Sequence, residues 1–309
     1  MIVFGPIPSR RLGRSLGINN IPPKHCTYSC IYCQAGPTDK CRIDRTEFYK
    51  PDVILEEVKI RLEKLKAKNE SIDFITFVPD GEPTLDINLG YLIEQLKATG
   101  NKLAVISNAS LLNRKDVRSD LFNADLVSIK VDTVDEKVWR KINRPHGKLR
   151  LSEILIGIKE FMETYQGSVF TETMLVNKVN DSIEVVSETA EFIKMISPER
   201  SFLLVPIRPP LCDRVLPSPI NSVNRAYQIF NDREINTRII SGDEGNNFTF
   251  IDDVEAELLS ITSVHPMTYE AINKFITESS SDWSLINKMI ESQKLRSVEY
   301  SGKKYFIKN

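Results

Sequence analysis

Short apolar runs alternate with amphipathic stretches along most of the chain, and this alternation limits the folds open to it. Each run has five to nine residues and is rich in Val, Ile, Phe or Thr. Such runs are typical of strands buried on both faces of a parallel sheet. The predicted strands are 15–21, 74–78, 102–107, 125–131, 168–176 and 201–207.

Helical patterns lie between these runs. Leu55, Val58, Leu62 and Leu65 recur at spacings of three and four after Pro51, a residue suited to the first turn of a helix. Strands that alternate with helices indicate βαβ units and a parallel sheet. Six strands are too few for an eight-stranded barrel of the usual type. We therefore predict an α/β fold with an open, partial (β/α)6 barrel over residues 1–240. The other predicted helices are 89–96, 186–193 and 221–233.

The pattern changes in the last quarter of the chain. Five prolines within 206–219 end the series of strands, and residues 241–251 are predicted to form a linker. Residues 252–309 contain three short helical patterns and then two β-like runs around Ser301-Gly302-Lys303. This order predicts a small winged-helix-like domain. The three helical patterns cover 253–260, 268–276 and 282–293.

Composition and charge exclude several classes of protein. With 41% hydrophobic and 27% charged residues, the chain has the composition of a soluble globular protein. No apolar run approaches the roughly 18 to 20 residues that a membrane span requires. The first residues do not form a secretory signal, because the arginines follow the apolar stretch. We therefore expect a cytoplasmic protein that does not contact a membrane.

The cysteines predict a metal site. Four of the five lie within residues 26–41, and such clustering in a cytosolic chain favours metal binding over disulfides. Cys26, Cys30 and Cys33 have the spacing of a compact loop that can hold an iron–sulfur cluster. A fourth iron without a protein ligand would stay open to a cofactor. Zinc is the alternative, with Cys41 or His25 as the fourth ligand.

The same segment resembles the signature of the radical S-adenosylmethionine (SAM) superfamily, Cys-x3-Cys-x2-Cys with an aromatic residue, here Tyr32, before the last cysteine. Asp80-Gly81-Glu82-Pro83 is similar to the GGEP motif that holds the SAM amino group, with Asp80 in place of the first glycine. The resemblance covers roughly residues 1–215. It implies that Cys26, Cys30 and Cys33 hold a catalytic [4Fe-4S] cluster. SAM would be cleaved there reductively to a 5′-deoxyadenosyl radical, which takes hydrogen from the substrate.

Polar residues at further strand ends match places where the superfamily binds the rest of SAM. Those after the third and fourth strands correspond to ribose and carboxylate contacts, and the sixth strand to the segment that contacts adenine. The SAM-binding residues that the resemblance implies are Tyr32, Gly81, Glu82, Pro83, Ser107, Asn108, Lys130, Asp132 and Val205.

Within the superfamily, the chain resembles the group related to the wyosine-synthesising tRNA enzymes. The matching segments are residues 4–23, Gln34-Ala35-Gly36 and Asn143-Arg144-Pro145-His146. Those enzymes carry a second cluster on additional N-terminal cysteines. No cysteine precedes Cys26 here, so we do not expect a second cluster of that kind.

Several residues are candidates for substrate binding. Arginines beside the first predicted strand suit a phosphate or carboxylate, with a solvated rim as the alternative. Two loop thiols and the Asn-Arg-Pro-His turn lie near the predicted site, although the simpler explanation of the thiols is that they are incidental loop cysteines. The candidates are Arg10, Arg11, Arg14, Cys41, Arg144, His146 and Cys212.

Three hypotheses for the function follow. The leading one is a radical SAM enzyme that modifies an RNA base, with tRNA as a candidate, because residues 288–309 hold six basic residues against two acidic ones. The second is a radical SAM enzyme that acts on a peptide or protein. The third is a non-catalytic, zinc-binding winged-helix regulator. Either enzyme would need a reductant protein of the flavodoxin or ferredoxin type.

Overall fold

The computed structural model describes residues 2–241, 248 and 253–309. Its main feature is a sheet of eight strands in the order β1-β2-β5-β6-β7-β8-β9-β10. β1 joins β2 in antiparallel fashion, and the strands from β2 to β10 are parallel. The two end strands are not neighbours, so the sheet stays open, as predicted. The strands are β1 (Val3–Ser9), β2 (Gly13–Ile18), β5 (Phe74–Phe77), β6 (Lys102–Ser107), β7 (Leu126–Lys130), β8 (Ser168–Met174), β9 (Arg200–Leu204) and β10 (Thr237–Ile240).

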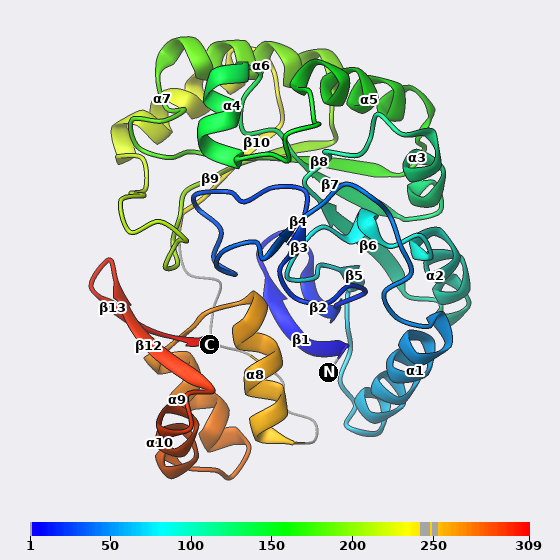
Figure 1. Cartoon of the computed structure of the whole chain (residues 1–309), viewed down its shortest axis with the longest axis vertical. Helices are drawn as coiled ribbons and strands as arrows, with labels where there is room; N and C mark the ends of the chain where they lie inside the picture. Colours follow the sequence, from blue (N-terminus) through cyan, green and yellow to red (C-terminus); the bar gives the residue numbers. More distant parts are fainter. Residues whose placement is uncertain (1, 242–247, 249–252) are drawn as a thin grey trace.

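Helices cover the outer side of the curved sheet, where α1, α2, α3, α5, α6 and α7 form an arc (Figure 1). The buried face of α1 has Ile54, Val58 and Leu65, which join one core cluster with strand residues such as Leu103 and Val127. The apolar stripe of each helix thus packs on the sheet. The helices are α1 (Pro51–Ala67), α2 (Leu89–Leu96), α3 (Lys115–Leu121), α4 (Glu136–Asn143), α5 (Leu151–Thr164), α6 (Ile183–Ile196) and α7 (Ile220–Asn231).

The six predicted strands correspond to β2 and β5 to β9, but the sheet is wider than predicted. β1 and β10 add a strand at each edge. β1 contains Gly5, Pro6 and Pro8, which argue against a strand in a sequence pattern. An edge strand can nevertheless contain such residues. β10 has only four residues. The prediction also missed α3, α4 and α5.

The sheet face turned away from the helices carries a second, smaller core. Leu12 lies in the turn between β1 and β2 and packs there with Phe170 and Phe202. Polar side chains share this face, since the Ser15 and Thr76 hydroxyls are 2.7 Å apart and Ser128 donates to Glu172 at 2.7 Å. The β1–β2 turn therefore folds across the inner side of the open barrel.

The C-terminal segment, residues 253–309, has three helices and a three-stranded antiparallel sheet in the order β11-β13-β12. The three helices and the hairpin fall where they were predicted, and β11 is an additional strand. The segment has its own core, which includes Leu258, Phe275 and Phe306. The predicted linker 241–251 lies almost wholly outside the described residues. The elements are α8 (Val254–Val264), β11 (Met267–Thr268), α9 (Tyr269–Glu278), α10 (Trp283–Glu291), β12 (Leu295–Tyr300) and β13 (Lys303–Lys308).

The C-terminal segment lies at the open side of the barrel, with α8 beside β1 (Figure 1). Arg61 of α1 forms a bidentate ion pair with Glu257 of α8, with one Nη2–Oε2 contact of 2.7 Å, and also donates to the Gly5 carbonyl at 2.9 Å. Glu257 is 0% exposed. Nowhere in the described ranges is a helix both long and apolar enough to cross a bilayer.

Replacing Arg61 with Met should destabilise the protein by about 3–5 kcal/mol, because it leaves the buried Glu257 carboxylate without its partner. Urea denaturation measures this loss. The double variant Arg61→Met/Glu257→Met should recover most of the stability, since no buried charge remains. Arg14→Ala, which removes a partly exposed ion pair with Glu70, should cost about 1 kcal/mol or less. Equal losses for Arg61→Met and the double variant would contradict the assignment.

Candidate active site

The three clustered cysteines line one cavity at the carboxyl ends of the strands. They lie on the cysteine loop, residues 24–41, which follows β2 and contains the short strands β3 (His25–Cys26) and β4 (Lys40–Cys41). Cys26, Cys30 and Cys33 all border a cavity of about 270 Å³. Because strand ends of a parallel sheet meet at one edge, the loop faces the last residue of β7 and the residues that follow β5 and β9.

Two asparagines contact the sulfur atoms, one directly after β6 and the other at the end of α4. The Asn108 Nδ2 atom lies 3.5 Å from the Cys26 Sγ, and the Asn143 Nδ2 atom lies 3.4 Å from the Cys30 Sγ. Burial raises the pKa of Cys26, and it raises the pKa of Cys30 to about 12. A metal that binds here therefore has to displace protons, and the amide donors then stabilise the thiolate charge.

The arrangement of the sulfurs fits a cluster better than a single ion. A zinc ion needs four ligands that meet around one point. Among the residues that the structure describes, no group of three or more His, Cys, Asp or Glu side chains is arranged to hold a single metal ion. A four-iron cluster binds each thiolate on a separate iron, so its ligands only have to face one cavity. Three partly buried thiols around one cavity meet that requirement.

Gly81 anchors the cysteine loop to the end of β5. A Cβ atom at Gly81 would lie 2.0 Å from the His25 carbonyl oxygen, so no larger residue fits at this close approach. The Lys24 amide donates to the Asp80 carbonyl at 2.8 Å, and the Glu82 amide donates to the His25 carbonyl at 3.1 Å. The Asp-Gly-Glu-Pro segment thus holds the entry of the loop beside the cavity.

The Glu82 side chain is buried behind the residues that line the cavity. It is 1% exposed and accepts hydrogen bonds from the Thr84 hydroxyl at 2.6 Å, the Ser107 hydroxyl at 2.8 Å and the backbone N–H of Asn108 at 2.7 Å. Pro83 begins a short, buried 3-10 helix, Pro83–Leu85. Glu82 therefore ties the end of β5 to the end of β6, and through Asn108 to Cys26.

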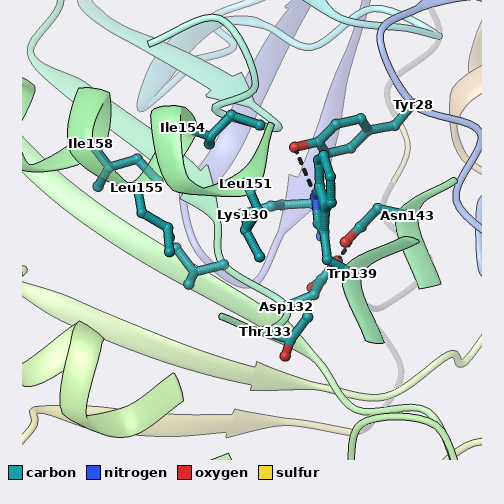
Figure 2. A pocket seen from close by; sticks show the side chains of 11 residues that line it. Tyr28, Lys130, Asp132, Thr133, Trp139, Asn143, Leu151, Ile154, Leu155 and Ile158 are labelled. Atoms are coloured by element: carbon teal, nitrogen blue, oxygen red, sulfur yellow. Dashed lines mark hydrogen bonds between the residues drawn. The ribbon is translucent and has the colours of Figure 1, made fainter. Parts of the chain in front are cut away.

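Asp132 is likewise a supporting residue behind the cavity wall. Its carboxylate accepts from the Tyr32 hydroxyl, from the Asn143 amide at 2.7 Å and from the Met174 backbone N–H at 2.9 Å. Figure 2 shows Asp132 and Asn143 at a second, small cavity of about 20 Å³, where the Trp139 indole donates to the Tyr28 hydroxyl at 3.2 Å. A space of this size suits one water molecule.

The floor of the main cavity carries linked charges. Glu172 on β8 forms ion pairs with Arg11 at 2.6 Å and with Lys130 at 3.4 Å. Although burial opposes its charge, the two cations hold the pKa of Glu172 at about 2. The Lys130 ammonium also lies 5.4 Å from the centre of the Tyr32 ring. Lys130 and Glu172 are direct neighbours in the β7–β8 ladder, which places both side chains on one face.

The structure thus brings about half of the predicted site residues to the main cavity. Those that line it are Arg10, Arg11, Cys26, Cys30, Tyr32, Cys33, Gly81, Lys130 and Val205. Five residues predicted to touch SAM lie behind the wall and contact residues that line it or support the cysteine loop. They are Glu82, Pro83, Ser107, Asn108 and Asp132.

The other substrate candidates lie apart from the cavity. Arg14 forms a surface ion pair with Glu70 at 2.5 Å. Arg144 and His146 border the cysteine loop on its other side, where their backbone groups bond to Ser29 and Thr27. Cys41 is exposed, and Cys212 packs against the apolar residues behind the loop. The sequence placed these residues near the loop without indicating which side they occupy.

Sequence reasoning missed several residues that line the cavity. Lys24 pairs with Asp80 at 3.1 Å, which gives a reason for an Asp where the superfamily motif has Gly. Gln34 donates to the Val264 carbonyl at 2.8 Å and accepts from Arg208 at 2.7 Å. These contacts join the cysteine loop, the segment after β9 and the end of α8. The sequence had marked Gln34 only as part of the Gln34-Ala35-Gly36 segment that resembles the wyosine group, without a role in the cavity.

Comparisons with known proteins agree with this geometry. The family model of the radical SAM superfamily matches residues 20–193. The SAM-bound structure of SuiB from Streptococcus suis has a TM-score of 0.53 and 16% identity, covering 74% of this chain and 51% of that one. A radical SAM methyltransferase from Sphaerobacter thermophilus has a TM-score of 0.53 and 14% identity, covering 74% of this chain and 66% of that one. The chain belongs to the radical SAM superfamily.

Its sequence also places it in a narrower group. The UPF0026 protein MJ1312 of Methanocaldococcus jannaschii is 47% identical over 310 residues, which cover 100% of this chain and 96% of that protein. The chain is therefore a UPF0026 protein and a radical SAM enzyme, with a [4Fe-4S] cluster and SAM as its cofactors. This result overturns the zinc-binding regulator as an alternative.

The residues around the cavity fit these cofactors. When bound, the cluster and SAM supply reductive cleavage of the sulfonium bond, which yields methionine and the 5′-deoxyadenosyl group as a radical and requires an electron from a reductant. The protein orients the reactants. Ile106, Leu204 and Val205 give the cavity an apolar wall that limits water, and Asn108 and Asn143 fix two of the sulfurs.

We propose that Cys26, Cys30 and Cys33 are the cluster ligands. Protein reconstituted without oxygen should then hold about four irons and four sulfides. Changing any of the three to Ala should remove most of the iron, measured by iron and sulfide analysis. Cys41→Ala and Cys212→Ala are matched controls and should keep it, since neither thiol lines the cavity. Iron retained by Cys30→Ala would refute the assignment.

Glu82→Ala should weaken SAM binding by about tenfold or more while the cluster still assembles, because it removes the acceptor that joins the ends of β5 and β6. Equilibrium dialysis of SAM with the reconstituted protein measures this, with iron content determined in parallel. Glu82→Gln keeps the shape and one acceptor oxygen and should restore part of the affinity. Unchanged affinity in Glu82→Ala would show that this link does not position the SAM site.

Proposed function

We propose that this radical SAM enzyme modifies a base in RNA, with tRNA as the candidate class. The position of the β12–β13 hairpin carries the proposal. The Tyr300 hydroxyl donates to the Pro206 carbonyl at 3.0 Å, and the Tyr305 hydroxyl donates to the Ile207 carbonyl at 2.8 Å. Pro206 and Ile207 line the main cavity. The exposed lysines of the hairpin are therefore attached to one wall of the catalytic cavity.

Those lysines are suited to phosphate. Lys303 and Lys304 are exposed at the hairpin, and Arg296 is exposed on β12. Lys294, which the sequence placed in the same basic group, forms an ion pair with Glu255 at 2.5 Å, so its charge is already matched. A strand of RNA held by the hairpin lysines would pass beside the cavity, and one of its bases would reach the part of the cavity where SAM binds.

The order of elements in the C-terminal segment supports a winged-helix-like domain over 252–309, with the barrel over 1–240 and a linker over 241–251. A helix, a short strand, two helices and a hairpin follow one another there. Winged helices bind nucleic acids as well as proteins, and the hairpin corresponds to the wing. In this proposal the wing both holds the cavity wall and offers its tip to RNA.

The remaining roles follow from the site. Gly81, Lys130 and Val205 would touch SAM, with Glu82, Ser107, Asn108 and Asp132 as positioning residues. An electron donor of the flavodoxin or ferredoxin type would reduce the cluster in the cytoplasm. The resemblance to the wyosine group favours tRNA, although a second cluster of the type found in that group is not expected here.

Binding of bulk tRNA should weaken steeply as salt rises, because each neutralised phosphate releases counterions. The variant Lys303→Ala/Lys304→Ala should reduce the magnitude of the log–log salt slope by up to roughly 1.5, at about 0.7–0.9 per lost contact. The measurement is fluorescence anisotropy of labelled tRNA at several salt concentrations.

Lys97→Ala/Lys102→Ala is the matched control. Lys97 follows α2 and Lys102 begins β6, at the amino end of the sheet and far from the hairpin (Figure 1). The salt slope of tRNA binding by this control variant should therefore equal that of the unaltered protein. If tRNA does not bind at low salt, or binds without salt dependence, the RNA proposal fails. A peptide substrate then becomes the better hypothesis, and weak salt dependence with a large negative heat-capacity change is its expected signature.

A further inference from the structure

The turn between β1 and β2 is built to hold Arg11 at the cavity floor. The Ser9 hydroxyl oxygen accepts from the backbone N–H of Arg11 at 3.4 Å and of Leu12 at 3.2 Å. Leu12 is buried in the core of the inner sheet face. Gly13 has a φ of +68°, and a Cβ atom there would lie 2.2 Å from the Asp73 carboxylate. The turn therefore has one well-supported conformation, and it directs Arg11 inward.

Arg11 brings a second cation to the Glu172 carboxylate at the cavity. Its Nη1 atom pairs with Glu172 at 2.6 Å, and the same carboxylate also pairs with Lys130. Two cations thus share one carboxylate. A guanidinium has five N–H donors, so one contact with Glu172 leaves donors for a ligand. Among the described residues, five cationic side chains line the cavity, against two carboxylates and the three cysteines that the cluster would bind as thiolates. The Arg11 donors that Glu172 does not use are therefore the part of this lining that is open to an anionic group.

The origin of Arg11 separates it from the SAM-binding part of the barrel. The match to the superfamily model begins at residue 20, and Arg11 precedes it in a hairpin at the edge of the sheet. Val205, Pro206 and the three cysteines account for the part of the cavity that the resemblance relates to the cofactors. Arg11 lies in the same cavity and is not among the residues that the superfamily resemblance assigns to SAM, and it belongs to residues 4–23, by which the chain resembles the wyosine group. It is therefore placed to select the substrate.

We infer that Arg11, held by the positioning residue Glu172, binds a phosphate of the nucleotide whose base is modified. The guanidinium is planar and presents paired donors that match phosphate oxygens. Glu172 fixes the Arg11 side chain before the substrate binds, so binding does not have to offset the conformational entropy of ordering Arg11. The inference rests on the proposed function for its choice of a nucleotide, and it identifies the residue that recognises that nucleotide.

The test uses reconstituted, SAM-loaded protein without oxygen. The four ribonucleoside 5′-monophosphates are compared with the four ribonucleosides by isothermal titration calorimetry. For at least one base, the monophosphate should bind about tenfold or more tightly than its nucleoside, as expected for a charge-assisted contact. Arg11→Gln should abolish that difference, and Arg11→Lys should restore part of it. Lys130 still pairs with Glu172 in these variants, which limits the effect on folding.

Arg14→Gln is the matched control, since Arg14 follows the same turn but pairs with Glu70 at the surface. It should keep the full preference for the monophosphate. Equal affinities of nucleotides and nucleosides in the unaltered protein would overturn the inference, as would a preference that survives Arg11→Gln. Binding of succinate but not succinamide, dependent on Arg11 and without any nucleotide binding, would also overturn it and indicate a carboxylate ligand.

The result is independent of the tRNA experiment. Nucleotide binding that depends on Arg11, combined with no binding of tRNA, supports the inference and overturns the proposed RNA substrate, leaving a free nucleotide. Salt-dependent tRNA binding through Lys303 and Lys304, combined with no effect of Arg11→Gln on nucleotide binding, has the opposite meaning. The RNA proposal then stands and Arg11 is not the phosphate ligand.

Discussion

The contact between Gly81 and the backbone of His25 is the constraint on which the site depends. A long loop that carries three cysteines cannot present them to one cavity unless both its entry and its walls are held. Gly81 permits the approach, and the Glu82 amide secures it through the His25 carbonyl. The Glu82 side chain then extends the support to Asn108, which contacts Cys26. One short motif after β5 thus orders the loop, the next strand end and a sulfur atom.

Much of this arrangement could be predicted because a parallel sheet gathers its strand ends. The strand patterns placed Gly81, Lys130 and Val205 at one edge, and all three line the cavity. The direction of individual side chains was beyond the pattern. Lys130 and Asp132 are two residues apart, yet Lys130 faces the main cavity and Asp132 supports Tyr32 from behind. That difference arises because β7 ends at Lys130, after which strand alternation no longer applies.

Contacts between distant segments were also outside the reach of sequence reasoning. Helical periodicity places Arg61 on the buried face of α1, where a charged residue contradicts the pattern. Its partner Glu257 lies 196 residues further along the chain, in a helix that was predicted correctly by itself. The ion pair explains both exceptions at once, because each charge is buried only through the other. A conflict between residue type and periodicity is therefore a signal for a long-range contact.

The cavity wall combines two kinds of sequence. One part comes from residues 20–193, which the superfamily shares, and it includes the three cysteines and Lys130. The other part comes from the β1–β2 turn, the segment after β9 and Val264 of the C-terminal segment. The second part includes Val205, which is expected to contact SAM, and also Arg11, which has no expected SAM contact and is a candidate for selecting the substrate. Gln34 connects the two parts, as it follows Cys33 and bonds to both Arg208 and Val264. A substrate that displaces the C-terminal segment would therefore also act on the cysteine loop.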